Sequence, residues 1–354
     1  MAGGLCTSSR MAQQHPTAGA VAGDPLWLAH RYDPVGDSVH FVPVSRDEHR
    51  AATFLTDEYL GDRTPVPVAR AEAVRNAGAA APIHFILHSA FCCSTLLARA
   101  FDIEGISMGL KEPVILNDLV GWHHRGGEPR RVGAVLDDAL TLLARPFSAG
   151  EAVIVKPSNL VNGFASAILS LRPGARALLL EAPLRTYLGS VAKKGMWGRL
   201  WVRDLLAKQL KEGLVDFGFS PDDYFGQTDL QVAGVGWLAQ HALFARLAGQ
   251  FGPERVKMLD SETLVARPAE TMAETARLFG LNIGASAIAA IAEGPVFNRH
   301  SKFGGSFGAA ERAAEHSDAA LIHADEIEKV AIWIEAVADR LGLPMTMAAP
   351  LLRG

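Results

Sequence analysis

The stretch "IHFILHSAFCCSTLLARA", residues 83–100, decides the fold class of this chain. Its first six residues have the pattern of a buried strand, "SAFCC" that of a turn, and the remainder that of a helix. In an open parallel sheet, the turn that leaves such a strand lies where ligands bind. The first turn of the next helix directs backbone N–H groups and the positive end of its dipole toward an anion. The stretch therefore predicts an α/β fold in which this turn lies where a ligand would bind.

The turn departs from the phosphate-binding motif G-x-x-x-x-G-K-[ST]. His88 and Cys93 stand where the glycines would be, and Ser94 stands where the lysine would be. The hydroxyls of Ser89, Ser94 and Thr95 could add donors to the backbone amides. On these residues alone, two readings stay open: a phosphate site, or a core strand joined to a core helix by small residues.

Three further apolar runs have the continuous pattern of strands that are covered on both faces. They are "EAVIVKPS" (151–158), "ARALLLEAP" (175–183) and "RVKMLD" (255–260). Helical patterns lie between them, and a long amphipathic helix closes the chain, so we expect a parallel sheet flanked by helices over residues 82–354. We expect residues 24–81 to form an irregular segment packed on this domain, and residues 1–23 to be a disordered tail.

Composition narrows the class of protein. The 354 residues carry a formal net charge of −4, which argues against a general nucleic-acid or membrane-surface binder. Three cysteines (Cys6, Cys92 and Cys93) cannot build a disulfide framework, and no apolar run approaches a membrane span. We therefore expect a soluble cytoplasmic protein. We expect no metal site, because Cys92 and Cys93 lack C-x-x-C spacing and His123–His124 has no partner at a helical interval.

Four stretches in order resemble the sulfotransferase family. "FILHSAFCCSTLLARA" (85–100) falls where the family has its phosphosulfate-binding loop, and "VIVKPSNL" (153–160) is similar to the family's Lys-Thr-Pro step. "SLRPGARALLLEAPLRTYLGSVAKKG" (170–195) looks like its central strand and helix. "VKMLDSETLVARPAETMAETARLFGL" (256–281) resembles its late strand, proline and helix ending in Phe-Gly-Leu. The resemblance spans about three quarters of the chain, residues 82–342.

The resemblance implies a P-loop NTPase-like three-layer α/β fold with a central parallel sheet. It implies transfer of a sulfuryl group from 3'-phosphoadenylyl sulfate, without a metal, to a hydroxyl or amine of a small molecule, glycan or peptide. A homodimer is possible. The donor would lie against the loop, which the following residues form: Ser89, Ala90, Phe91, Cys92, Cys93, Ser94 and Thr95.

This chain departs from the family pattern at the residues that would bind the donor. Phe91 stands at the loop's Lys or Arg, and Cys93 at its Gly. Glu181 replaces the Arg of Arg-Asp-Pro, which in the family contacts the 3'-phosphate. Arg185, one helical turn later, could take its place, and Ser190 fits the family serine within one residue.

Candidate catalytic residues follow the loop. Glu112 in "GLKEPVILND" stands at the distance at which several sulfotransferases carry their general base, and we expect it in the first turn of a helix before Pro113. Lys111 could supply the positive charge that Phe91 does not, and Lys156 could face the donor from a strand end. His88 is the alternative base.

Two further basic stretches have both a binding and a plain structural interpretation. In "FNRHSKFGGSFG" (297–308), the resemblance makes Arg299, Ser301 and Lys302 candidate contacts of the donor, against a linker before the last helix. "AKKGMWGRLWVRDLL" (192–206) could flank the acceptor, or it could be an ordinary amphipathic helix whose tryptophans pack inward.

Two other functions compete with sulfuryl transfer. The first is a P-loop kinase of a small molecule, against which the absent Walker lysine and Mg²⁺-ligand pattern count. The second is a non-catalytic nucleotide-binding or scaffold protein with this fold, favoured by Phe91 and Glu181.

Overall fold

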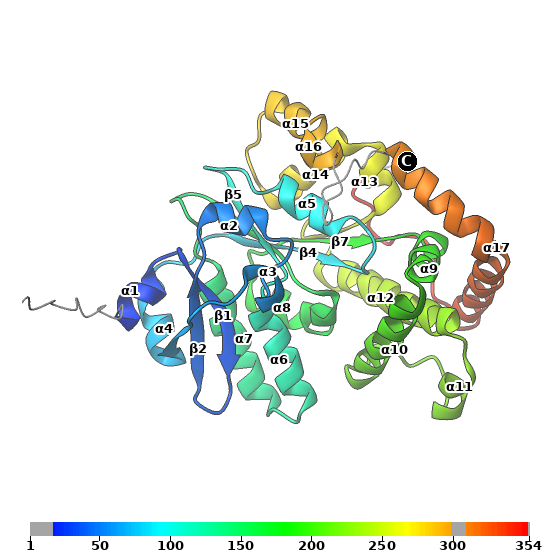
Figure 1. Cartoon of the computed structure of the whole chain (residues 1–354), viewed down its shortest axis with the longest axis horizontal. Helices are drawn as coiled ribbons and strands as arrows, with labels where there is room; N and C mark the ends of the chain where they lie inside the picture. Colours follow the sequence, from blue (N-terminus) through cyan, green and yellow to red (C-terminus); the bar gives the residue numbers. More distant parts are fainter. Residues whose placement is uncertain (1–16, 299–308, 353–354) are drawn as a thin grey trace, which may run out of the picture.

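A computed structural model describes residues 17–298 and 309–352 of the chain. Its centre is a five-stranded parallel sheet in the order β5-β6-β4-β7-β8 (Figure 1). The strands are β4 (Ile83–His88), β5 (Ser107–Lys111), β6 (Ala152–Lys156), β7 (Ala177–Glu181) and β8 (Val256–Asp260). The first strand of the domain is therefore central, with later strands added on both sides. The carboxyl end of β4 lies at the point where the chain changes direction, the usual ligand position in such sheets.

Helices cover both faces of this sheet, which confirms the expected three-layer α/β architecture. Alternate residues of β4 enter different cores: Phe85 and Leu87 join one cluster, and Ile86 joins the other. The first core is covered by α6 (Val114–His124), α7 (Pro129–Leu143), the 3-10 helix η1 (Asn159–Phe164) and α8 (Ala165–Leu171). The second is covered by α5 (Ser94–Ala100), α9 (Leu184–Lys193), α10 (Gly195–Lys211), α14 (Pro268–Phe279) and α17 (Ala309–Arg340).

Helix α12 (Asp229–Phe251) contributes to both cores, which explains why its pattern is apolar over much of its circumference. The shorter helices are α11 (Pro221–Gly226), α13 (Ser261–Ala266), α15 (Ala285–Ala292) and α16 (Pro295–Asn298). Within the two described ranges, none of the helices combines the length and apolar character needed to span a bilayer.

The N-terminal segment is ordered, and our expectation of an irregular segment was wrong. Its three strands form an antiparallel sheet beside the main domain, in the order β1-β2-β3 (Figure 1). The elements are α1 (Ala18–Gly23), β1 (Trp27–Asp33), β2 (Ser38–Pro43), α2 (Arg46–Ala51), α3 (Asp57–Leu60), β3 (Val66–Ala69) and α4 (Arg70–Asn76). Val21 and Ala22, which lie within the predicted tail, are fully buried, so this part of it is ordered. β2 and β3 are short and each contains a proline, so their alternation of apolar and polar residues was too weak to be recognised as that of a strand.

Strand β5 was also missed by the sequence analysis. "SMGLK" is short and contains Gly109, whose position lies against the carbonyl of Ala98 in α5, so a Cβ there would clash at 2.7 Å. Glu112 therefore does not lie in the first turn of a helix. It lies between β5 and α6, with Pro113 as the N-cap of α6.

Candidate anion-binding site

The turn between β4 and α5 has the backbone conformation of a glycine-rich loop without the glycines. Ala90, Phe91 and Cys93 have φ of 77°, 52° and 62°. Each left-handed non-glycine residue costs of the order of 1 kcal/mol, and such strain gathers at functional sites. Glu112 (φ 52°), at the end of neighbouring β5, belongs to the same set. Four of the five non-glycine residues with positive φ in the described chain thus lie at one edge of the sheet.

Hydrogen bonds hold this turn from beneath. The Ala90 N–H donates to His88 Nδ1 (3.1 Å), and His88 Nε2 donates to the carbonyl of Pro157 (3.0 Å). Ser89 Oγ accepts from the Ala182 N–H at 3.1 Å, which joins the turn to the end of β7. Because both ring nitrogens of buried His88 are engaged, it is placed to shape the turn rather than to accept a substrate proton.

Helix α5 begins at Ser94, and no side chain caps it. The first N–H groups of a helix have no acceptor within it, and such groups can bind an anion. Ser94 and Thr95 are buried in this first turn. Burial raises the pKa of the Cys92 thiol to about 11, so this side chain is a neutral core group below the loop.

An ion pair lies beside the loop. Lys156, at the end of β6, is 1% exposed, and its Nζ donates to Glu112 Oε1. The positive charge of Lys156 acts on Cys92, so the pair lies close enough to influence the loop. The carboxylate of Glu112 keeps 18% of its side-chain surface exposed. Glu112 is thus both held by a buried cation and open to solvent, as a proton acceptor must be.

The N-terminal segment completes this edge of the sheet. The Lys156 ammonium lies 5.0 Å from the centre of the Phe54 ring, a cation–π contact, and Tyr59 packs edge-on against Phe54. The pKa of the Tyr59 phenol is raised by burial, with the charges of Glu58 and then Glu112 adding to it. Phe54 and Tyr59 carry no motif, and their role depends on how the N-terminal sheet docks, so the sequence analysis missed both.

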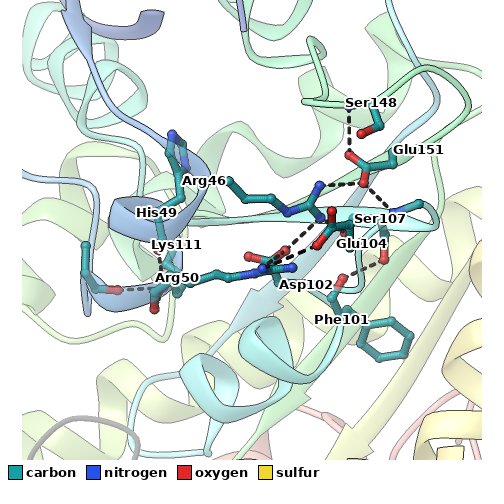
Figure 2. Close-up of polar contacts among 12 residues, drawn as sticks. Arg46, His49, Arg50, Phe101, Asp102, Glu104, Ser107, Lys111, Ser148 and Glu151 are labelled. Atoms are coloured by element: carbon teal, nitrogen blue, oxygen red, sulfur yellow. Dashed lines mark hydrogen bonds and ion pairs between the residues drawn. The ribbon is translucent and has the colours of Figure 1, made fainter. Parts of the chain in front are cut away.

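Lys111 points away from the loop. Figure 2 shows it among charged residues of α2, the start of β5 and their neighbours. Its Nζ donates to the carbonyls of His49 (2.6 Å), Arg50 (3.0 Å) and Ala52 (2.6 Å). These carbonyls close the C-terminal end of α2, and Leu55 N–H donates back to the Lys111 carbonyl (2.7 Å). Lys111 therefore fastens the N-terminal segment to β5, next to Glu112, and does not bring its charge to the donor loop.

Arg185 of α9 is held by carboxylates of α17. Its guanidinium makes two hydrogen bonds to Glu328 (2.8 and 2.7 Å) and one to Glu335 (2.6 Å), both on α17. Ser190 lies half-buried on the same helix. Buried Glu181 pairs with His241 of α12 (2.9 Å), so this position serves to join β7 to α12. Arg299, Ser301 and Lys302 lie outside the described residues.

Away from the loop, a cavity of about 510 Å³ opens at the amino ends of β7 and β8. Its walls carry Arg176, Glu254, Lys257, Arg267 and Glu270. Arg267 pairs with Glu270, and Arg176 Nη1 donates to the carbonyl of Leu278 (2.8 Å). Among the described residues, no group of three or more His, Cys, Asp or Glu side chains could hold a metal ion.

Comparison with known proteins gives structural likenesses alone. No family model matches the chain, and no curated protein does. The solved structures similar to this chain include a sulfotransferase domain from the curacin biosynthetic pathway, at 13% identity and a TM-score of 0.39, over 75% of this chain and 99% of that one. A sulfotransferase of Mycobacterium avium is 13% identical, with a TM-score of 0.42, over 72% of this chain and 78% of its own. One of Mycobacterium tuberculosis H37Rv is 13% identical, with a TM-score of 0.39, over 61% and 72%.

Proposed function

We propose that this protein is a sulfotransferase that moves a sulfuryl group from 3'-phosphoadenylyl sulfate to a hydroxyl or amine of an acceptor. The observation that carries the proposal is the left-handed backbone at Ala90, Phe91 and Cys93, directly before the uncapped start of α5. Strain of this kind persists only where the surrounding structure fixes it, and a loop of this shape turns its amides toward an anion. The four stretches that resemble sulfotransferases in order identify which anion we expect.

The residues at the loop fit a phosphosulfate group. Backbone N–H groups of the turn, with the hydroxyls of Ser94 and Thr95, would bind its oxygens, because charge-assisted hydrogen bonds to an anion are the strong ones. The buried Lys156 adds a positive charge at the adjacent strand end. Glu181 does not fit the 3'-phosphate, since it is a buried carboxylate paired with His241. We expect other cations, Arg299 and Lys302 among them, to serve that group.

Glu112 would act as the general base. In the transfer step, the acceptor hydroxyl gives its proton to the Glu112 carboxylate while its oxygen forms a bond to sulfur. The bond between sulfur and the bridging phosphate oxygen breaks, and its electron pair leaves with adenosine 3',5'-bisphosphate. Once Glu112 is protonated, the Lys156 ammonium can turn its charge to the leaving oxygen. The contact between these two side chains is thus the feature that couples proton removal to departure of the bisphosphate.

Two alternatives stay in view. A kinase would need a cation at the phosphates together with Mg²⁺, and a scaffold protein would bind a nucleotide without turnover. A thermal-shift series with adenosine 3',5'-bisphosphate, ATP and no ligand, each with and without Mg²⁺, separates the three. We expect the bisphosphate to stabilise the protein without Mg²⁺, by about 2.7 kcal/mol at a hundred times its Kd. Stabilisation by ATP only with Mg²⁺ would favour the kinase, and no shift at millimolar bisphosphate would overturn the donor assignment.

A further inference from the structure

Lys111 of β5 is tied at two points to the chain between α2 and α3. Its Nζ donates to the carbonyls of three residues at the end of α2, namely His49, Arg50 and Ala52. Figure 2 shows Lys111 beside His49 and Arg50. The Lys111 carbonyl accepts from the Leu55 N–H at 2.7 Å. Because three acceptors engage all three protons of an ammonium, Lys111 in its charged form fixes both the start and the end of this short segment.

Phe54 lies between these two points, and its ring contacts the ion pair of the candidate site. The Lys156 ammonium is 5.0 Å from the centre of the Phe54 ring, which is a cation–π contact. The same ammonium donates to the Glu112 carboxylate. The segment that Lys111 fixes at both ends therefore carries the ring that holds this cation beside the proposed base.

The backbone gives a second connection from Lys111 to the same ion pair. Lys111 lies opposite Lys156 in the register of β5 and β6, and the Glu112 N–H donates to the Lys156 carbonyl at 2.7 Å. Glu112 then takes a left-handed backbone conformation, with φ of 52°. Such a conformation persists only where the surrounding structure fixes it. A shift of Lys111 would therefore redirect the Glu112 carboxylate as well.

A second buried cation fastens the N-terminal segment at another place. Arg145, which is 7% exposed, donates to the carbonyls of Ala22 (2.6 Å) and Trp27 (2.7 Å) in that segment, and to that of Leu142 in α7 (2.7 Å). Arg145 and Lys111 thus both serve buried carbonyls of the N-terminal segment. The residues that Arg145 contacts belong to α1, β1 and α7, elements that carry none of the residues of the candidate site.

We propose that Lys111 is a positioning residue for the transfer step: by fixing the segment that carries Phe54, it holds the Lys156 ammonium against the Glu112 carboxylate. This inference rests on the proposed function for the role of Glu112. Lys111 acts through these neighbours and not through its own charge at the donor. The N-terminal segment is then part of the active site, although no motif in it indicates such a role.

The test compares Lys111→Met with Arg145→Met, because each change keeps an apolar stem and leaves buried carbonyls without their donor. Burial, with Arg99 nearby, lowers the pKa of Lys111 to about 7, so assays at about pH 6 keep the wild-type ammonium charged. With 3'-phosphoadenylyl sulfate and water as substrates, Lys111→Met should lower kcat per folded molecule by about 10²-fold, as a misplaced reacting group does, and keep KM within about threefold. Arg145→Met should keep kcat within about twofold of the wild type, although both variants lose stability in urea.

Phe54→Leu tests the route by which Lys111 acts, since it removes the ring and leaves the Lys111 contacts in place. It should lower kcat by a similar factor. The double variant with Lys111→Met should be no slower than Lys111→Met alone, because residues that act by one route are not additive. Lys111→Gln keeps two amide donors and replaces Lys111→Met in each comparison if the methionine variant does not fold.

Three results would overturn the inference. The first is an equal kcat for Lys111→Met and Arg145→Met. The second is an unchanged kcat in Phe54→Leu. The third is a double variant whose loss of kcat is the product of the two single losses, because Lys111 and Phe54 would then act independently.

Urea unfolding separates failure of this inference from failure of the proposed function. If the wild type releases no adenosine 3',5'-bisphosphate from the donor, the proposed function is wrong, and the urea midpoints then decide the role of Lys111. The midpoint losses of Lys111→Met and Phe54→Leu should be less than additive in the double variant. Those of Lys111→Met and Phe251→Leu should add, because the Phe251 ring packs on Arg255 instead. Additive losses in both pairs would show that Lys111 does not position Phe54, whatever the reaction.

Discussion

Replacing Glu112 by glutamine tests the base and its buried partner together. The amide keeps the shape of the side chain and can still accept a hydrogen bond from Lys156, but it cannot take a proton. General bases contribute about 10²–10⁴-fold in rate, so turnover of Glu112→Gln should fall by about that factor. The affinity for adenosine 3',5'-bisphosphate should change by less than about threefold, because the amides of the loop are untouched.

Stability has to be measured beside turnover, because Lys156 is 1% exposed. Removing the partner of a buried charge costs up to about 3–5 kcal/mol. We expect less here, about 1–3 kcal/mol, since the amide still accepts a hydrogen bond and the Glu112 side is partly exposed. Lys156→Met removes the buried charge, so the double variant Glu112→Gln with Lys156→Met should be more stable in urea than Glu112→Gln alone.

The assay is the slow conversion of the donor by water, followed as release of adenosine 3',5'-bisphosphate, until an acceptor is known. Unchanged turnover in a folded Glu112→Gln protein would refute the role of Glu112 as base. A double variant no more stable than Glu112→Gln would refute the view that Lys156 carries an uncompensated charge in that variant.

Three further predictions follow from contacts elsewhere. Cys93→Gly should leave the free energy of unfolding unchanged or raise it by up to about 1 kcal/mol, because relief of left-handed strain exceeds the added freedom of the unfolded chain. The control Ala98→Gly, in the helical part of α5, should lower it by about 1 kcal/mol. If urea unfolding showed both variants to be destabilised equally, the loop geometry would be contradicted. Arg185→Ala should keep the bisphosphate affinity within about threefold and the free energy of unfolding within about 1 kcal/mol of the wild type, since the partners of Arg185 are exposed carboxylates of α17. A tenfold loss of affinity would show that Arg185 does contact the donor. Burial, with a smaller effect of Lys111, lowers the pKa of His49 to about 3. The unfolded chain binds a proton there below about pH 6.5 while the folded protein does not, so stability should fall as the pH decreases from about 6.5 toward 3. His49→Phe, which would pack on Phe147, should flatten this dependence on pH, and an identical slope in both proteins would argue against the role of His49.

The parallel sheet could be predicted because four of its strands are buried on both faces and therefore appear as continuous apolar runs. β4, β6, β7 and β8 all lie within such runs. β5 could not be recognised in the same way, since Gly109 interrupts its pattern to accommodate α5. The N-terminal strands are short and half-covered, and their alternation is broken by prolines at Pro43 and Pro67.

The sequence predicts the site residues that directly follow a strand, but it does not predict those whose position depends on how distant segments pack together. The loop follows β4 directly, and Lys156 ends β6, so both positions could be inferred from strand ends. The direction of the Lys111 and Arg185 side chains is set by α2 and α17, which are distant in sequence. The contact of the Lys156 ammonium with the Phe54 ring spans more than a hundred residues and has no local signature.

The measurement that tests the central claim most directly is the fate of labelled 3'-phosphoadenylyl sulfate mixed with the purified protein, in parallel with labelled ATP and Mg²⁺. The account predicts that adenosine 3',5'-bisphosphate is released without any added metal, that release accelerates when hydroxyl acceptors are supplied, and that Glu112→Gln suppresses it. Release of ADP from ATP with Mg²⁺, while the sulfate donor stays intact in the presence of folded protein, would contradict it.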